Sequence, residues 1–418
     1  MTRRPFVPPF LWLLSAFAAG VLLDRGGWLP GRSDGQPPAV RRAYAPFWQA
    51  REKIHKYYAD PAAASDERLL RGAISGMVFS LGDVGHSTYL TAEDRARLRA
   101  GLAGNLEGIG ARLTLVRARP RLVITQTMPG SPARKAGVRA GDEILAVADR
   151  AAERMTLAEV VAALRGKPGT TVKVRLRRPG RDDPVTVTIK RAKVEVSEVN
   201  WQALPGEPAL AHLAFHRFSN NSGKQMRQAL RVIARRKFRG LVLDLRGNSG
   251  GYKDQAIKVA SEFLREGEVI FIQQDAEGAQ EPVKAKGGGV ARAMPLVVLI
   301  DGGTASSAEI LAGALQDHRR ARLVGTRTFG TGTVLREYPL SDGSSVLLAI
   351  YQWLTPSGKR VWHRGVSPDV EVSLPYEATA LVPQGGEAVD AAEYEASGDV
   401  QLKKARDLLA EQLKKRKK

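Results

Sequence analysis

Two similar stretches in the C-terminal half constrain the fold more than any other feature of the chain. In each, a short apolar strand ends in a glycine-containing loop that leads into a helix; the strands cover residues 240–246 and 295–300, and the helices residues 254–264 and 306–316. Strands that are apolar throughout are typical of a mostly parallel sheet with helices on its faces. The carboxyl ends of parallel strands meet at one edge of a sheet, and we therefore expect the two loops to lie on the same edge.

Ser306 lies where the second of these loops meets its helix. The first turn of a helix has unpaired N–H groups and a partial positive charge, which stabilise an alkoxide or a neighbouring oxyanion. Ser306 is therefore a candidate nucleophile. The alternative reading of this stretch alone is a helix cap, with Glu309 completing a capping box on Ser306. The first loop, G-N-S-G-G over residues 247–251, lacks the lysine spacing of a phosphate loop and fits a backbone oxyanion hole better.

The N-terminal segment has the pattern of an export signal. Arg3 and Arg4 precede an apolar run over residues 6–23, and a linker rich in glycine and proline follows it. The run is barely long enough to span a bilayer. We expect it to be an uncleaved membrane anchor, with a cleaved signal as the alternative. Either one places the body of the protein outside the cytoplasm, in the periplasm or cell envelope, or secreted.

Composition narrows the classes of partner and chemistry. A net charge of +21 predicts an acidic neighbour, either nucleic acid or an anionic membrane. The export signal and the lack of an aromatic and basic platform argue against nucleic acid. The basic C-terminus, K-K-R-K-K, is interpreted as a solvated tail or a contact with anionic lipid. The chain has no cysteine, which excludes disulfides and thiol catalysis, and no metal constellation or cofactor is predicted.

Residues 41–100 are predicted to be helical, and Thr91 with Asp94 signals one helix start. A turn-rich stretch before that start contains His86. A histidine in a loop is a possible catalytic group. We interpret His86 as a packing or hydrogen-bonding residue, because the sequence places no partner beside it.

Residues 101–193 change to short strands between turns. They contain E-G-I-G-A at 107–111, S-P-A at 131–133 and A-G-V-R-A-G-D-E-I-L at 136–145, followed by strands at 172–176 and 185–189. This order resembles a PDZ domain. The resemblance implies a groove in which an extended peptide adds as a strand, while the backbone amides of Gly108, Ile109 and Gly110 hold its terminal carboxylate. The alternative is a small β domain that binds nothing.

Four further stretches carry a second resemblance, which runs from about residue 41 to 374. They are L-V-L-D-L-R-G-N-S-G-G, D-G-G-T-A-S-S-A-E-I-L-A-G-A-L-Q-D, V-G-T-R-T-F-G-T-G and W-L-T-P-S-G-K-R-V-W-H-R-G-V-S-P-D. Together they resemble the carboxyl-terminal processing, or tail-specific, proteases of the S41 serine peptidase family. The resemblance implies a crotonase-like, spiral α/β protease core that cleaves proteins near unfolded C-terminal tails. It implies Ser306 as the nucleophile, with an oxyanion hole formed by the Ser307 amide and the Gly250 or Gly251 amide.

One departure concerns the general base. The resemblance implies lysine in the motif F-G-K-G and a glutamine four residues later, but this chain has Thr331 and Leu335 at those positions. A buried lysine works as a base because burial lowers its pKa, whereas a threonine hydroxyl is far too weak. The replacement bases that the sequence offers are Lys359, His363 and Glu309.

Three explanations of Thr331 stay open at the level of sequence: a relocated base, a pseudoprotease that binds tails as an adaptor, or slow hydrolysis by Ser306 with water as base. The sequence favours a serine endopeptidase that acts on unfolded or tail-exposed proteins. The expected organisation is α/β and multidomain, with a mostly-β PDZ-like domain inserted before the protease core. Its parts are the anchor and linker (1–40), an N-terminal helical region (41–100), the PDZ-like domain (101–193), the protease core (194–378), and a linker with a basic C-terminal helix (379–418).

Overall fold

The computed structural model describes residues 37–415 except 84–85, 104, 117–120, 129, 140, 180, 182, 196, 376–377, 379 and 384–390. The chain divides into two compact units, Met1–Met77 and Val78–Lys418. The expected membrane anchor, residues 6–23, lies outside the described residues. Among the helices that are described, none combines the length and the apolar character needed to cross a membrane.

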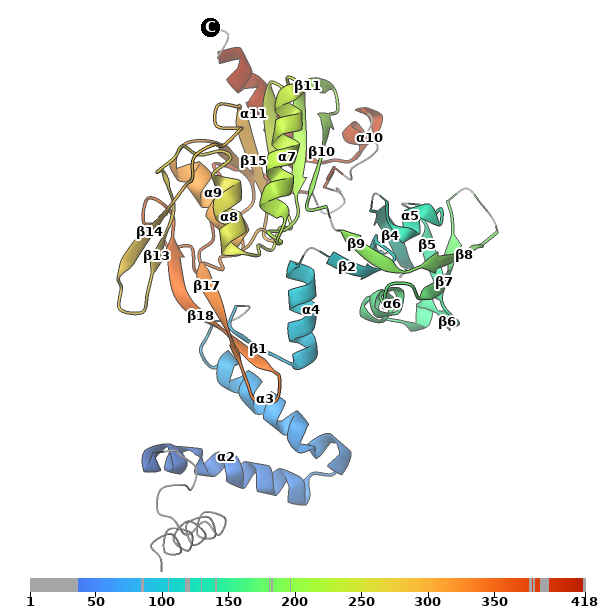
Figure 1. The fold of residues 1–418 in the computed structure, drawn as a ribbon, viewed down its shortest axis with the longest axis vertical. Coiled ribbons are helices and arrows are strands. Elements are labelled where there is room, and N and C mark those ends of the chain that lie inside the picture. The colour runs from blue at the N-terminus through green and yellow to red at the C-terminus, as the bar shows by residue number, and fades with distance from the viewer. Residues whose placement is uncertain are drawn as a thin grey trace, which may run out of the picture. The chain divides into compact units, whose positions relative to one another are not determined.

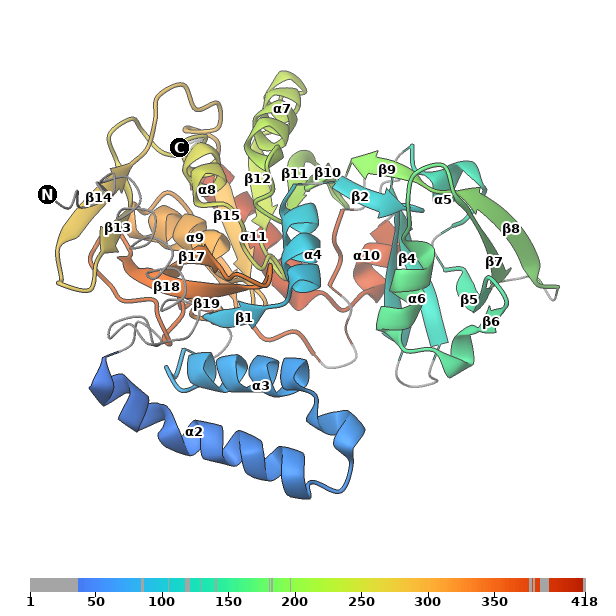
Figure 2. The same cartoon turned by 60° about the horizontal axis from the view of Figure 1, so that its bottom comes forward.

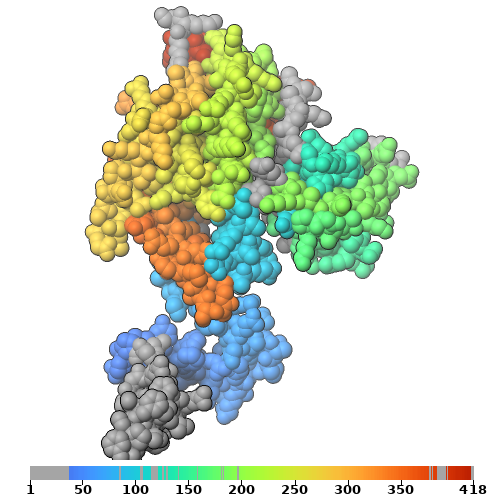
Figure 3. Space-filling view, in the orientation of Figure 1, coloured from blue at the N-terminus to red at the C-terminus, as the bar shows by residue number. Residues whose placement is uncertain are grey.

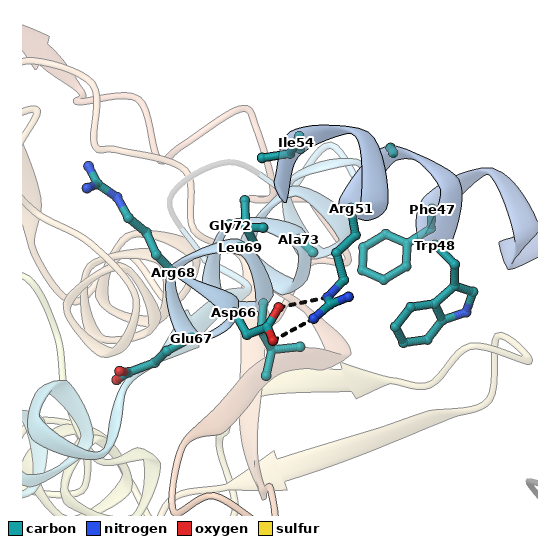
Figure 4. Close-up of a pocket in the computed structure, with 12 residues that line it drawn as sticks. Phe47, Trp48, Arg51, Ile54, Asp66, Glu67, Arg68, Leu69, Gly72 and Ala73 are labelled. Carbon is teal, nitrogen blue, oxygen red and sulfur yellow. Dashed lines mark hydrogen bonds and ion pairs between the residues drawn. The ribbon is translucent and has the colours of Figure 1, made fainter. Parts of the chain in front are cut away.

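The described part of the first unit, from residue 37 on, consists of helices with little buried surface. Helix α2 (Pro38–Tyr57) has no buried residue and is followed by a 3-10 turn, η1 (Pro61–Ala64), and by α3 (Asp66–Phe79). Arg51 of α2 donates two hydrogen bonds to Asp66 of α3, at 2.7 and 2.6 Å (Figure 4). Beside this pair, Phe47 and Trp48 line a hollow of about 740 Å³. The aromatic side chains of α2 are therefore largely on the surface, and Trp48 is 61% exposed.

The sheet that positions the candidate nucleophile has six strands in the order β10-β11-β12-β15-β16-β19. Its strands are β10 (Val199–Leu204), β11 (Glu207–Phe215), β12 (Gly240–Asp244), β15 (Leu296–Ile300), β16 (Arg322–Gly325) and β19 (Val370–Glu371). Only β10 is antiparallel to its neighbour, and every residue of β12 and β15 is buried. The mostly parallel sheet expected from the two apolar strands is confirmed.

Helices cover both faces of this sheet (Figure 1). On one face lie α7 (Ser222–Arg235), α8 (Lys253–Ala260) and α9 (Ser307–Asp317), whose apolar side chains share one core with Leu241, Leu243 and Val298. On the other face α11 (Val400–Lys415) packs Leu402 and Leu409 against Val242 and Val297. Alternate residues of β12 and β15 thus pack into the two cores, because successive side chains of a strand point to opposite faces of the sheet.

A second sheet of the core contains β1 (Thr88–Leu90), β13 (Val269–Gln274), β14 (Gln280–Lys284), β17 (Thr333–Pro339) and β18 (Ser345–Leu354). Strands β17 and β18 form an antiparallel pair (Figure 2). After β1, helix α4 (Ala92–Leu102) begins with the predicted capping box, in which Thr91 and Asp94 bond to each other's backbone N–H. In the space-filling view, the segments from α7 to β14 pack as a continuous mass (Figure 3).

The residues between α4 and β10 form a separate small β structure with its own core. One sheet contains β3 (Ala111–Val116), β4 (Arg121–Thr127), β5 (Glu143–Val147), β6 (Arg150–Ala151), β7 (Thr171–Arg177) and β8 (Val185–Lys190), and β2 (Asn105–Gly108) pairs with β9 (Ala192–Glu195). Two helices, α5 (Pro132–Lys135) and α6 (Leu157–Leu164), accompany the strands. Ile124, Val160 and Leu176 are among the residues of this core.

A buried ion cluster joins the C-terminal segment to the end of β12. Arg246 pairs with Asp244 at 2.8 Å and with Asp399 at 3.0 Å, and all three side chains are at most 4% exposed. Burial alone lowers the pKa of Arg246, but the two carboxylates outweigh it and raise that pKa. Asp399 also accepts the Leu402 N–H at 2.9 Å, at the start of α11. The cluster therefore fixes both the helix and the residue that precedes the first glycine loop.

We predict that Asp399→Ala lowers the free energy of unfolding by about 3 kcal/mol, because it leaves a buried guanidinium without one of its two carboxylate partners. Urea unfolding followed by tryptophan fluorescence measures the change. The matched control is Asp407→Ala on the same helix, whose side chain is 61% exposed and pairs with Arg406; it should cost less than about 1 kcal/mol. Equal effects of the two changes would contradict the prediction.

Candidate active site

The two glycine loops lie against each other where β12 and β15 end. The Gly247 N–H donates to Asp301 Oδ1 at 2.9 Å, and the Ala305 N–H donates to the Asn248 carbonyl at 2.9 Å. The Thr304 hydroxyl donates to the Leu245 carbonyl at 2.9 Å. The expectation that both loops occupy one edge of the sheet is confirmed, because β12 and β15 are parallel neighbours.

Ser306 occupies a sharp turn between β15 and α9. Its φ is 53° and its ψ is −120°, and it is the N-cap residue of α9. Positive φ is uncommon for a residue with a side chain, and such backbone strain gathers at functional sites. A strained serine between a strand and a helix is also the arrangement of a nucleophile elbow. Glu309 accepts the Ser306 N–H at 2.8 Å, so the site contains one half of the capping box as well.

The glycine loop approaches Ser306 so closely that only glycine fits. Gly250 has a φ of 92°, and a Cβ there would stand 2.6 Å from the Ser306 Cβ and 2.9 Å from the Ser307 nitrogen. The Gly250 N–H is already bonded to Asn248 Oδ1 at 2.9 Å. Within the described part of the chain, the N–H groups of Gly251 and Ser307 have no such partner. These two are therefore the expected oxyanion donors that remain available.

The Glu309 carboxylate holds the turn at Ser306 together with a third loop, residues 326–332 between β16 and β17. It is fully buried and accepts four hydrogen bonds, from the Ser306, Gly330 and Thr331 N–H groups at 2.8, 2.7 and 2.9 Å and from the Thr328 hydroxyl at 2.5 Å. Burial raises the pKa of Glu309, and the four donors offset part of that rise. Its oxygens are already bonded to these donors, so the structure does not support Glu309 as the replacement base.

The positions of the absent lysine and glutamine lie on this third loop and the strand that follows it. Thr331 is 7% exposed, and its N–H bonds to the same Glu309 oxygen, Oε2, as the Ser306 N–H. Leu335 lies on β17, paired with Ala349 of β18. Thr331 is thus close to Ser306, but its hydroxyl is not a base.

The structure does not support Lys359 as the replacement base. Its Nζ pairs with Asp317 Oδ1 at 2.9 Å, and its side chain is 66% exposed. Asp317 is the last residue of α9 and Ser306 precedes the first, so about 15 Å of helix lies between them. His363 is exposed, and its ring stacks on Trp362 with centroids 4.8 Å apart.

A histidine that the sequence left without partners has them in the structure. His86 is 4% exposed and its Nδ1 lies 3.2 Å from Oδ1 of Asp83, itself 6% exposed. Nδ1 is also 3.3 Å from the Thr333 hydroxyl. The His86 ring lies 5.9 Å from that of Phe329, centroid to centroid. The one signal in the sequence is the spacing of Asp83 and His86 in a turn, because the other partners come from some 250 residues further along.

In the small β structure, the loop that is expected to bind a terminal carboxylate covers residues 108–110. It is hydrogen-bonded to the segment that follows β4. The Ile109 and Gly110 carbonyls accept the Ala133 and Met128 N–H groups at 2.8 and 2.9 Å. Gly110 has a φ of 73°, and a Cβ there would lie 2.5 Å from the Ser131 Cβ. Gly108 ends strand β2 and pairs with Ala192 of β9. The loop is thus fixed in shape, with glycine required at residue 110.

Comparison with protein families gives two matches. Residues 209–372 match peptidase family S41, and residues 123–178 match the PDZ domain. The first span contains Ser306, both glycine loops and Thr331, and the second lies within the small β structure. Both resemblances drawn from the sequence are confirmed.

Individual proteins agree with these matches. A carboxy-terminal-processing protease of Bartonella bacilliformis is 33% identical over 365 residues, which cover 86% of this chain and 82% of that protein. The carboxy-terminal processing protease CtpA of Bacillus subtilis is 35% identical over 330 residues, covering 78% of this chain and 69% of that protein. The fold is also that of a Bacteroides fragilis protein assigned to the S41 proteases, with a TM-score of 0.52 at 18% identity over 78% of this chain and 90% of the other.

We predict that Glu309→Gln lowers the free energy of unfolding by about 2–3 kcal/mol, because the amide NH2 must then face a buried backbone N–H that has lost its acceptor. The reaction of Ser306 with a fluorophosphonate, followed by mass spectrometry, should slow at the same time. Lys258→Ala serves as the control, since its ion pair with Asp254 is exposed on both sides and contributes less than about 1 kcal/mol. A Glu309→Gln protein as stable and as reactive as the wild type would show that the carboxylate does not organise the site.

Proposed function

The chain belongs to peptidase family S41 and is a serine endopeptidase of the carboxy-terminal processing type, and from this premise we propose that it cleaves extracytoplasmic proteins near their C-terminal tails with Ser306 as nucleophile. The observation that carries the assignment of Ser306 is its strained turn at the start of α9, pressed against Gly250. A helix N-terminus stabilises negative charge where a peptide carbonyl becomes an oxyanion.

In this mechanism Ser306 Oγ attacks the carbonyl carbon of the scissile peptide bond. The N–H groups of Gly251 and Ser307 receive the oxyanion, and collapse of the tetrahedral intermediate releases the C-terminal fragment as an amine. Water then hydrolyses the acyl-enzyme. The Ser307 hydroxyl supports the donors, because it donates to the Gly251 carbonyl at 2.9 Å and so joins the two loops.

The PDZ-like domain supplies tail capture in this proposal. The match to a PDZ domain and the constrained loop at Gly108, Ile109 and Gly110 support it. A terminal carboxylate fits such a loop because backbone N–H groups bind an anion without any side chain in the way. Tail capture also explains how the enzyme selects substrates by their ends.

The cellular setting and the domain limits are part of the same proposal. We infer that residues 6–23 anchor the chain and that the basic C-terminus contacts anionic lipid, on the strength of the two arginines before the apolar run and the net charge of +21. We retain the expected limits of 41–100, 101–193, 194–378 and 379–418 for the successive parts, and the crotonase-like spiral arrangement for the core. The parallel sheet with helices on both faces supports that arrangement.

The competing function is a tail-binding adaptor without catalysis, and Thr331 is the observation that favours it. The strained Ser306 and the two available oxyanion donors favour the enzyme, because an adaptor needs neither.

We predict that Ser306→Ala abolishes cleavage of an unfolded protein with an apolar C-terminal tail by the full chain in detergent. Gel electrophoresis and mass spectrometry of the fragments measure cleavage, and Ser357→Ala, in an exposed turn, is the matched control. If the wild type and Ser306→Ala are equally inert while the tail still binds, the adaptor replaces the enzyme.

We also predict that a substrate ending in a carboxamide has a KM at least about tenfold higher than the same substrate ending in a carboxylate, with a smaller change in kcat. The amide loses charge-assisted hydrogen bonds made in both ground and transition states. Gly110→Ala should remove this preference. Gly130→Ala is the control, because Gly130 has a similar positive φ of 69° but open space around it. An equal KM for the two substrates would refute tail capture.

A further inference from the structure

The attack by Ser306 requires a proton acceptor, which the residues discussed above do not provide. Thr331 is too weak a base, the Glu309 oxygens are bonded to four donors, and Lys359 lies beyond the far end of α9. Two histidines also lie beside the third loop: His363, whose N–H donates to the Gly330 carbonyl at 2.8 Å and whose side chain is exposed, and His86, which is buried with Asp83. Of the two we consider His86, because a carboxylate oxygen lies against its ring nitrogen.

Asp83 has the contacts of an orienting carboxylate. Its Oδ2 accepts the Ser87 hydroxyl at 2.6 Å and the Ser87 N–H at 3.1 Å, and its Oδ1 accepts the Trp362 Nε1–H at 3.1 Å. His86 Nδ1 lies 3.2 Å from that same Oδ1. A carboxylate oxygen this close to Nδ1 favours the tautomer with the hydrogen on Nδ1, which leaves Nε2 with a lone pair. The pair therefore holds the imidazole in the tautomer that a general base needs.

The position of His86 follows from its contacts with the third loop. Phe329 and Thr333, which contact His86, stand two residues before and two residues after Thr331. The Phe329 N–H donates to the Thr304 carbonyl at 3.0 Å, two residues before Ser306. The imidazole thus borders the loop on which the family resemblance implies lysine, and that loop is bonded to the nucleophile's turn on two sides.

We propose that His86, oriented by Asp83, is the general base of Ser306 in this chain and stands in for the absent lysine. This proposal rests on the proposed function. The Ser306 O–H bond breaks as Oγ bonds to the carbonyl carbon, and the proton passes to His86 Nε2, directly or through water. His86 then gives that proton to the leaving nitrogen as the C–N bond breaks. In deacylation it takes a proton from water and returns it to Ser306.

The electrostatics of the pair suit a base at neutral pH. Burial lowers the pKa of His86, the charge of Asp83 raises it in part, and His363, whose ring stacks 6.4 Å away, lowers it. The net direction is downward, so the imidazole is neutral at pH 7. Activity requires this neutral form and is therefore lost as the pH falls through the lowered pKa of His86, below the usual range for histidine.

The test compares kcat/KM against pH for the full chain and its variants, with the same unfolded substrate. His86→Gln should lower kcat/KM at pH 7 at least about 100-fold, and Asp83→Asn should lower it as well, because the wrong tautomer is then available. His55→Gln, an exposed histidine paired with Asp66, is the matched control and should stay within about twofold. Unfolding midpoints are measured for each variant.

A double variant, His86→Gln with Thr331→Lys, distinguishes a role of His86 as base from a purely structural role. The double variant should have a kcat/KM at least about tenfold higher than that of His86→Gln alone. The acidic limb of its pH profile should move to higher pH by a unit or more, because an amine titrates above an imidazole. A structural role of His86 predicts no such rescue and no shift.

The two proposals fail in different ways. If cleavage depends on Ser306 but His86→Gln keeps the wild-type rate and pH profile, or if Thr331→Lys gives no rescue, His86 is not the base while the protease stands. If the wild type neither cleaves nor reacts with a fluorophosphonate at Ser306, both the protease and its base are wrong.

Discussion

The Glu309 carboxylate is the interaction on which the candidate active site depends. Its two oxygens accept N–H groups from the turn at Ser306 and from the third loop about 20 residues later, so these two segments meet at one buried charge. A charge in the interior is stable only when its hydrogen bonds are all made. The hydrogen bond from the Ser306 N–H to this carboxylate also explains how the turn at Ser306 can keep a strained backbone.

This arrangement also accounts for the tolerance of threonine where the resemblance implies lysine. Glu309 binds the backbone N–H of Thr331, not its side chain. Replacement of the side chain therefore leaves the loop in place, and the catalytic role can pass to another group that borders the loop. The buried pair of Asp83 and His86 borders it and has the chemistry of such a group.

The sequence predicted features that depend on neighbouring residues or on strand pattern. It predicted the parallel sheet, the two adjacent glycine loops and the capping box of Thr91 and Asp94, because periodicity and helix caps are local signals. Lys359 was misplaced because the turn that holds it packs at the far end of α9. The partners of His86 were not predicted, because Thr333 and Trp362 approach Asp83 and His86 only through tertiary packing, which leaves no trace at sequence spacing.

The ion cluster of Arg246, Asp244 and Asp399 makes the first glycine loop depend on a residue 153 positions further along the chain than Arg246. Asp399 neutralises the arginine that immediately precedes that loop. A chain cut before residue 399 must leave the guanidinium partly uncompensated, and the loop then lacks this support. Proteolytic loss of the C-terminal segment is therefore expected to disturb the loop beside Ser306 as well as the end of the chain.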